Sequence, residues 1–229
     1  MKRLSLVLLL ITIGIGPGCT TLSGKQSDEA GGQQAVRRHT LKELRDRHVV
    51  KQEKDFSCGA AALATLMIYY YGEQTSEHDV LTRLMAPLTD EEKTRKAERG
   101  FSLLDLKRVA LEKGFQAAGF RLTMTQLARV TAPLLIFVEP FGYKHFAVLR
   151  GIDRGRVYVA DPMRGNLKMS IGRFLDEWHG IVFVLGKSGE EKITDYPLKV
   201  PAPEYIQPEL ARFNSYLDLG MMTPTLPLR

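Results

Sequence analysis

Cys58 is the residue of this sequence best placed to act as a nucleophile. Turn-forming residues precede it, and residues 59–71 after it are almost all apolar or small. The pattern predicts a buried helix that begins at Cys58, capped by Ser57 or Asp55. Unpaired backbone N–H groups and the helix dipole at such a position favour a thiolate. A single cysteine is nevertheless more often a buried structural residue, so its partners must decide its role.

A thiolate nucleophile needs a histidine and a group that orients that histidine. Of the five histidines, His145 opens an apolar strand directly after a turn, and Asp161 closes the next strand before Pro162. A hairpin of these two strands would bring both side chains to the same edge. Taken singly, His145 reads as an ordinary strand-end residue and Asp161 as a turn former. Together they predict a Cys–His–Asp arrangement with Cys58.

Residues 1–19 have the layout of an export signal. A short basic start precedes an apolar run over residues 4–15, which is well short of the roughly 20 residues that span a bilayer. Cys19 then follows a small residue, as in the lipobox of bacterial lipoproteins, although Gly16 and Pro17 depart from that pattern. We expect an exported, periplasmic protein, anchored at the outer membrane where Cys19 is lipidated; ordinary cleavage to a soluble exported protein is the alternative.

Processing of the signal changes two properties of the chain. Cys19 would be lipidated or lost, which leaves Cys58 without a disulfide partner in a chain that has two cysteines. A free thiol is a liability in an oxidising compartment, so this favours a functional Cys58. Loss of Lys2 and Arg3 lowers the formal charge of +6 by two. The remaining charges are of mixed sign and form no basic patch, so we expect no nucleic-acid partner.

The rest of the sequence predicts one α+β domain, because helical patterns come first and strand patterns follow. Residues 20–38 are typical of a flexible tether, residues 39–187 form the domain, and residues 188–229 form a proline-rich arm with one short helix near 208–217. We expect helices over residues 40–47, 58–71, 76–85, 102–114, 125–130 and 171–178, an exposed and mobile stretch over 89–99, and strands over 116–121, 134–138, 145–151, 156–160, 167–170 and 181–185.

The combined motifs resemble the C39 cysteine peptidases, papain-like domains of bacteriocin-processing transporters that cut leader peptides after a Gly-Gly pair. The resemblance covers residues 49–187, and the residues that carry it are Gln52, the run 57–59, the helix end at 69–72, the run 144–149 and the run 160–162. One departure is Ser57, where many members have Asp. The implied fold packs an N-terminal helical half on a C-terminal antiparallel sheet.

The resemblance also implies a role for each site residue. Cys58 would be the nucleophile, His145 its base and later its acid, and Asp161 the residue that orients the imidazole. Gln52 would donate a side-chain N–H to the oxyanion, together with the backbone N–H of Cys58. No metal or cofactor is implied. Phe141 is a candidate wall of a Gly-Gly slot, as is Tyr143, although core packing is the simpler expectation for both aromatic side chains.

The sequence thus predicts an exported cysteine endopeptidase that acts on a peptide or protein substrate through a Cys58 thioester. No transporter segments accompany the motifs, so the chain resembles stand-alone members, some of which serve functional-amyloid secretion systems. A bacteriocin or amyloid component cut after Gly-Gly is one candidate substrate, and a secretion apparatus is a candidate partner. Two alternatives stay open: a peptide-binding adaptor with little or no proteolysis, and transfer of the acyl group to an amine.

Overall fold

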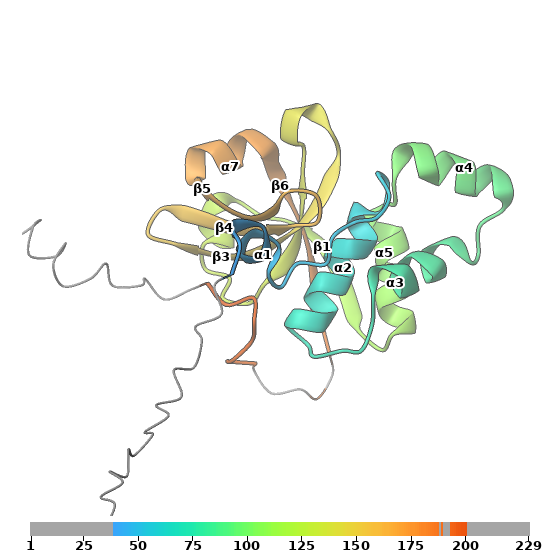
Figure 1. Cartoon of the computed structure of the whole chain (residues 1–229), viewed down its shortest axis with the longest axis horizontal. Coiled ribbons are helices and arrows are strands. Elements are labelled where there is room, and N and C mark those ends of the chain that lie inside the picture. Colours follow the sequence, from blue (N-terminus) through green and yellow to red (C-terminus); the bar gives the residue numbers. More distant parts are fainter. Residues whose placement is uncertain (1–38, 188, 190–192, 201–229) are drawn as a thin grey trace, which may run out of the picture. The chain divides into compact units, whose positions relative to one another are not determined.

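The computed structural model describes residues 39–187, 189 and 193–200, which combine helices with one antiparallel sheet (Figure 1). This is the α+β arrangement that the sequence predicts. The export signal, Cys19, the tether and the helix expected near 208–217 lie outside the described residues. In the part of the chain that is described, no helix combines the length and apolar character that crossing a membrane requires.

The central helix, α2 (Cys58–Tyr69), is apolar on every side. Ten of its twelve residues are buried. A helix without a polar face can be accommodated only in an interior, and α2 packs against α3 (Glu77–Met85) and β3 (His145–Asp153). The remaining helices are α1 (Leu41–Asp46), α4 (Asp90–Arg99), α5 (Leu103–Glu112), α6 (Met124–Leu127), the 3₁₀ helix η1 (Pro140–Gly142) and α7 (Ile171–Glu177).

The start of α2 differs from our expectation, because the side chain of Ser57 does not cap it. The hydroxyl of Ser57 instead accepts the N–H of Lys54 at 3.1 Å and donates to the carbonyl of Lys54 at 2.8 Å. These two bonds close the turn in front of the helix. The N–H groups of the first turn, beside Cys58, therefore donate no hydrogen bond to the side chain of Ser57.

Helix α4 forms where we expected an exposed and mobile stretch. Thr89 and Glu92 make a reciprocal capping box: the N–H of Glu92 donates to the Thr89 hydroxyl at 3.3 Å, and the N–H of Thr89 donates to the Glu92 carboxylate at 2.9 Å. Acidic residues open the helix, and Lys96 and Arg99 close it, as the helix dipole favours. The capping signal outweighs the high charge. None of the α4 residues is buried, so the expected exposure is found.

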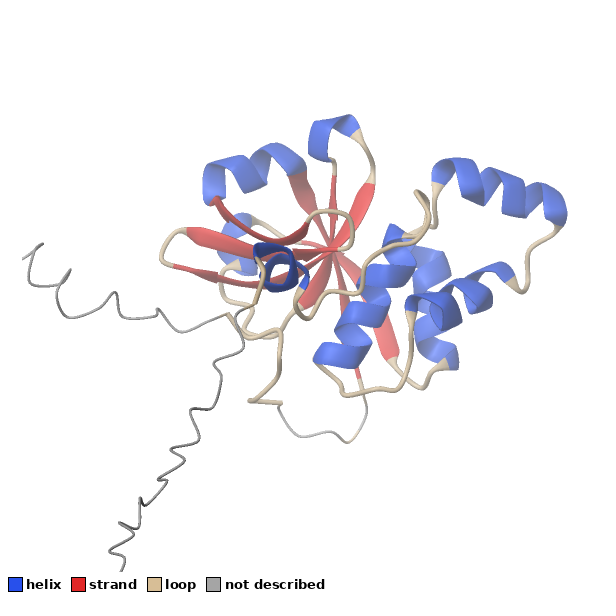
Figure 2. Cartoon of the chain, in the orientation of Figure 1, coloured by secondary structure: helices blue, strands red, loops and turns tan. Residues whose placement is uncertain are grey.

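Six strands form one antiparallel sheet in the order β1-β6-β2-β3-β4-β5. Figure 2 shows the strands in red and the helices beside them in blue. All six coincide with predicted strands, with ends that differ by a few residues. The turn between β4 and β5 is tight: Asp161 pairs with Gly165, so three residues connect the two strands. The strands are β1 (Gln116–Arg121), β2 (Leu134–Val138), β3 (His145–Asp153), β4 (Arg156–Asp161), β5 (Gly165–Ser170) and β6 (Trp178–Gly186).

Both faces of the sheet are covered at its centre, which explains why residues 145–149 of β3 are buried without interruption. Phe146 and Val148 belong to the core shared with α2, α3 and α5, whereas Ala147 and Leu149 belong to a second core that includes Phe174 of α7. Successive strand residues point to opposite faces, so each core takes alternate residues. Helices accordingly lie on both sides of the sheet (Figure 1).

Residues 193–200, which we call the strap, lie against the domain. Leu198 is fully buried. Arg150 in β3 holds the strap backbone: its Nε donates to the carbonyl of Leu198 at 2.9 Å, and its Nη2 donates to the carbonyls of Pro197 and Lys199 at 3.3 and 3.0 Å. The strap therefore packs on the domain. Its buried leucine and the bonds from Arg150 to three consecutive carbonyls hold this segment of the proline-rich arm in place.

Candidate active site

Three segments that are far apart in the sequence meet at one end of the sheet. They are the N-terminus of α2 with Cys58, the start of β3 with His145, and the end of β4 with Asp161 and the turn that follows it. The segment before α2 is fixed to the same turn, because the N–H of Gln52 donates to the carbonyl of Pro162 at 3.2 Å. The structure thus brings all four predicted site residues into one region.

Cys58 is the first residue of α2 and is 7% exposed. It forms no disulfide with another described residue. Its thiol lies close enough to the imidazole of His145 to contribute to the raised pKa of that histidine. The sulfur therefore lies between a helix N-terminus and an imidazole, two features that favour a thiolate in proteins.

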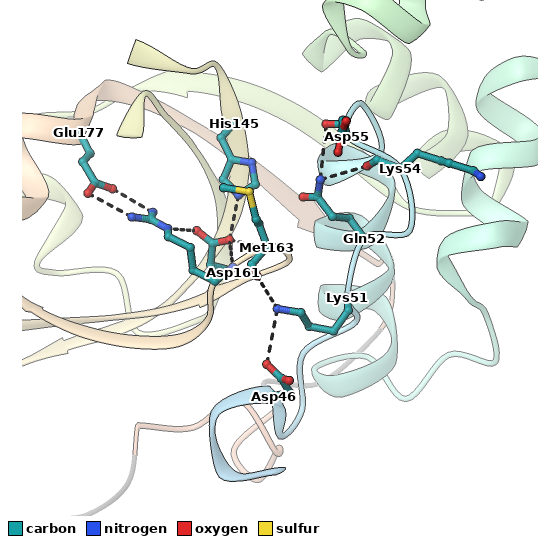
Figure 3. A network of polar contacts seen from close by, with 10 residues as sticks. Asp46, Lys51, Gln52, Lys54, Asp55, His145, Asp161, Met163 and Glu177 are labelled. Atoms are coloured by element: carbon teal, nitrogen blue, oxygen red, sulfur yellow. Dashed lines mark hydrogen bonds and ion pairs between the residues drawn. The ribbon is translucent and has the colours of Figure 1, made fainter. Parts of the chain in front are cut away.

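His145 is buried, and its Nε2 lies 2.9 Å from Oδ1 of Asp161 (Figure 3). With Nε2 bound to the carboxylate, Nδ1 is the ring nitrogen left for Cys58. Burial lowers the pKa of His145, but hydrogen bonds to Asp161 and Cys58 and their negative charges outweigh burial and raise the pKa to about 9. The imidazole is therefore protonated near neutral pH when it faces these two groups.

The Asp161 carboxylate is fully buried and accepts hydrogen bonds on both oxygens. Oδ1 accepts the backbone N–H groups of Met163 and Arg164 at 2.8 and 2.9 Å, in addition to His145, and Oδ2 accepts Nε of Arg164 at 2.7 Å. Burial raises the pKa of Asp161, but the bonds from His145 and Arg164 outweigh burial and hold it well below its usual range. Asp161 thus stays ionised and fixed in orientation.

Two further charged residues continue the contacts of Asp161, and neither is among the predicted site residues. Nη2 and Nη1 of Arg164 donate to the two carboxylate oxygens of Glu177 at 2.9 and 3.2 Å. The side chains of Arg164 and Glu177 are 17% and 12% exposed. Arg164 stands three residues after Asp161, which is the only local signal that could have indicated a contact. Glu177 lies on α7, and no spacing rule links it to this turn.

The amide of Gln52 does not have the orientation that the predicted role requires. Its Nε2 donates to the backbone carbonyls of Lys54 and Asp55 at 3.0 and 3.4 Å. Its Oε1 is buried and accepts no hydrogen bond from a described residue. In Figure 3 this oxygen lies on the side of Gln52 that faces His145. An oxygen at that position would repel an oxyanion, so the amide has to turn over before Gln52 can donate to one.

Aromatic side chains beside the site are exposed, contrary to the core packing that we expected. Phe141 is 84% and Tyr143 is 75% exposed. Phe141 has a left-handed backbone with φ of 54°, which is uncommon for a bulky residue and directs the chain just before β3. Met163, in the turn after Asp161, is 54% exposed. Three large side chains therefore reach solvent from the segment just before His145 and the turn just after Asp161.

Two other histidines contact groups other than the predicted site residues. His48 bonds the carbonyl of Pro197 at 3.1 Å, and His179 lies 3.5 Å from the carboxylate of Glu139. Among the described residues, no group of three or more histidine, cysteine or carboxylate side chains is arranged to hold a metal ion. The chemistry available here is that of a thiol, an imidazole and a carboxylate.

Comparison with known sequences places this geometry in a family. Residues 46–190 match the profile of the peptidase C39 family. The chain belongs to this family, and it is a cysteine peptidase. It is 35% identical over 222 residues to the "Probable functional amyloid protease FapD" of Pseudomonas aeruginosa, covering 97% of this chain and 96% of that protein. A Pseudomonas fluorescens protein of the same name is 33% identical over 225 residues, again covering 97% and 96%.

Solved structures show the same papain-like C39 fold. A double glycine motif protease from an AMS/PCAT transporter, crystallised with its leader peptide, matches with a TM-score of 0.50 at 25% identity, covering 60% of this chain and 89% of that one. The peptidase domain of Streptococcus ComA matches with a TM-score of 0.51 at 24% identity, covering 61% and 97%. These C39 peptidase domains confirm the predicted fold class.

Proposed function

We propose that this peptidase is exported and cleaves a protein component of a functional-amyloid system, with Cys58 as nucleophile, His145 as general base and acid, and Asp161 as the residue that orients His145. The proposal rests above all on the buried contact between His145 and Asp161 beside Cys58 at a helix start. Export and attachment of a lipidated Cys19 to the outer membrane belong to the same proposal and rest on the sequence of residues 1–19.

In the first half-reaction, the imidazole of His145 holds the proton that the thiol of Cys58 has given up, and the sulfur attacks the carbonyl carbon of the scissile bond. The tetrahedral oxyanion is held by the backbone N–H of Cys58 and by the turned amide of Gln52. His145 then returns its proton to the leaving nitrogen as the C–N bond breaks, which releases an amine and leaves a thioester. Water, deprotonated by His145, hydrolyses this thioester to a carboxylic acid and restores the thiol.

A functional-amyloid protein is the proposed substrate because of the proteins that resemble this chain in sequence. The two Pseudomonas proteins named as functional amyloid proteases match almost from end to end. The transport and processing proteins LagD and ComA match over only 26% and 20% of their own lengths, so their activity as whole proteins carries less weight. Cleavage after Gly-Gly draws support from the double glycine motif protease, whose fold this chain shares.

The test compares the wild-type chain with Cys58→Ala in a strain that lacks the endogenous gene. Mapping of protein N-termini in periplasmic and outer-membrane fractions should reveal new N-termini in an amyloid component with the wild type only. His78→Ala, a change at an exposed histidine on α3, should behave as the wild type. Identical N-termini with Cys58→Ala would reject the peptidase role and favour the peptide-binding adaptor. A product joined to a foreign amine would indicate acyl transfer.

A further inference from the structure

A row of alternating charges extends from the proposed active site to the last residue of α7 (Figure 3). Beyond His145 and Asp161 it continues with Arg164 and Glu177. We propose that Arg164 and Glu177 are positioning residues that set the proton affinity of His145 through Asp161. This inference rests on the proposed function, in which His145 is the general base and acid.

Arg164 contributes charge to Asp161 more than it contributes orientation. Two backbone N–H groups of the turn, from Met163 and Arg164, already hold Oδ1 of Asp161. The guanidinium adds a positive charge 2.7 Å from Oδ2. Such a charge, acting alone, attracts the carboxylate and weakens its hold on a protonated imidazole. A buried aspartate paired only with arginine would therefore be a poor partner for His145.

Glu177 offsets this effect because its carboxylate faces both terminal nitrogens of Arg164 in a bidentate pair. The pair is mostly buried, so solvent screens it weakly. Glu177 is the last residue of α7, and its carbonyl accepts the N–H of Glu139 at 2.7 Å, just after β2. The carboxylate is thus held by the fold itself. With Arg164 neutralised, Asp161 keeps its charge available for His145.

Other charged groups around His145 do not take over this role. Cys58 faces the imidazole from α2. Glu139, next to the strand position that pairs with His145, is engaged with His179 at 3.5 Å. Lys51 donates to the carbonyl of Met163 at 2.7 Å and lies 3.5 Å from Asp46. Within the described residues, the only side chains that bond the Asp161 carboxylate are those of His145 and Arg164.

The arrangement predicts that Glu177→Gln and Arg164→Gln shift the midpoint of the His145 titration in opposite directions. Glu177→Gln leaves the Arg164 charge uncompensated, so the midpoint of the His145 titration should fall by about one pH unit. Arg164→Gln removes the positive charge and leaves the backbone bonds to Asp161, so the midpoint should rise by roughly half a unit. The double variant should titrate within roughly 0.3 units of the wild type. Loosened packing alone would shift the His145 midpoint in the same direction in both single variants.

The experiment is an NMR titration of the full chain labelled with ¹³C-histidine, in which the His145 signal is assigned from its loss in His145→Gln. The wild-type midpoint is expected near pH 9, where the His145 pKa lies. Glu112→Gln, which breaks an exposed pair with Arg108 on α5, is the matched control and should leave the midpoint unchanged. An unmoved midpoint in Glu177→Gln, or shifts of the same sign in both single variants, would overturn the proposal.

The outcome does not depend on folding of one variant or on proteolysis. Should Glu177→Gln not fold, Arg164→Gln decides alone, because an absent or downward shift contradicts the mechanism. The titration needs no substrate, so the absence of a cleaved protein with the wild-type chain would reject the proposed function without affecting this readout. Conversely, normal cleavage with an unmoved His145 midpoint would reject only the role of Arg164 and Glu177.

Discussion

Nε2 of His145 lies 2.9 Å from Oδ1 of Asp161, and the two side chains are 6% and 0% exposed. Sixteen positions separate these residues in the sequence. They meet because β3 and β4 form an antiparallel hairpin that returns the chain to the same edge. In a buried setting each group stabilises the charged form of the other.

Replacing Asp161 by asparagine should lower kcat by about 10²- to 10⁴-fold, because the imidazole loses both its orientation and its charged partner. The buried Arg164 also loses one of its two carboxylates, which should cost roughly 1–3 kcal/mol of unfolding free energy. Steady-state kinetics on the native substrate and urea denaturation measure the two effects. Asp90→Asn, at a carboxylate that is 94% exposed, is the control and should change neither.

The pH dependence of stability follows from the His145 pKa. Its folded-state pKa of about 9 exceeds the ordinary value of 6.5, so protonation of His145 favours the folded state. This contribution, up to about 3 kcal/mol, is complete below the ordinary pKa and disappears as the pH rises through about 9. The lowered pKa of Asp161 has the opposite consequence: its contribution is present above 3.8 and is lost as the pH falls below that value.

Urea denaturation between about pH 6 and about pH 10 measures the alkaline part of this dependence. The wild type should lose stability over that interval, and His145→Gln should lose clearly less. Equal losses in the two proteins would contradict the raised pKa of His145. Activity should also decline as the pH rises through about 9, because His145 is then unprotonated and cannot donate a proton to the leaving nitrogen.

Replacing Gln52 by alanine should lower kcat by roughly 10²- to 10³-fold with little change in KM, because the oxyanion forms only during the reaction. This requires the amide to turn from the carbonyls of Lys54 and Asp55 toward the substrate. Stopped-time cleavage assays of the native substrate measure the effect. Gln74→Ala, at an exposed glutamine, should retain full activity. An undiminished kcat for Gln52→Ala would exclude Gln52 from the oxyanion site.

Gly165→Ala should disturb the turn that holds Asp161. A Cβ at position 165 would lie 2.7 Å from the Cγ and the carbonyl oxygen of Arg45 in α1, and Gly165 has a φ of +81°. Gly155 has a similar φ of +72° with open space around it. Gly155→Ala should therefore cost only the left-handed backbone strain of about 1–2 kcal/mol, whereas Gly165→Ala should cost more and also lower activity. Thermal unfolding and cleavage rates compare the two variants.

Leu198→Ala tests whether the strap stabilises the domain. The side chain is fully buried between elements of the first core, so its truncation should cost roughly 2–4 kcal/mol of unfolding free energy. Leu111→Ala, at a leucine that is 52% exposed, should cost no more than about 0.5 kcal/mol. Urea denaturation of both variants provides the comparison. Equal small effects would show that residues 193–200 contribute little to stability.

Local sequence patterns determined most of the secondary structure. They also determined the helix start at Cys58 and the pairing of His145 with Asp161. The apolar run after Cys58 admits only a buried helix, and the alternation of turns with short apolar runs predicts all six strands. His145 and Asp161 could be paired from sequence because they close a simple hairpin. The same patterns did not indicate α4, where a capping box outweighs the high charge, and of the two residues expected to cap α2, Ser57 or Asp55, Ser57 forms no side-chain cap.

Tertiary structure decided which polar groups meet beyond the hairpin. The Arg164–Glu177 pair joins a turn to the end of α7, and Arg150 joins β3 to the strap, so neither contact has a spacing signal. The orientation of the Gln52 amide depends on carbonyls two and three residues further on, and that loop is fixed by Ser57 and by the turn after β4. Hydrophobic periodicity records which face of an element is buried. It carries no information about which charges face one another once the elements pack.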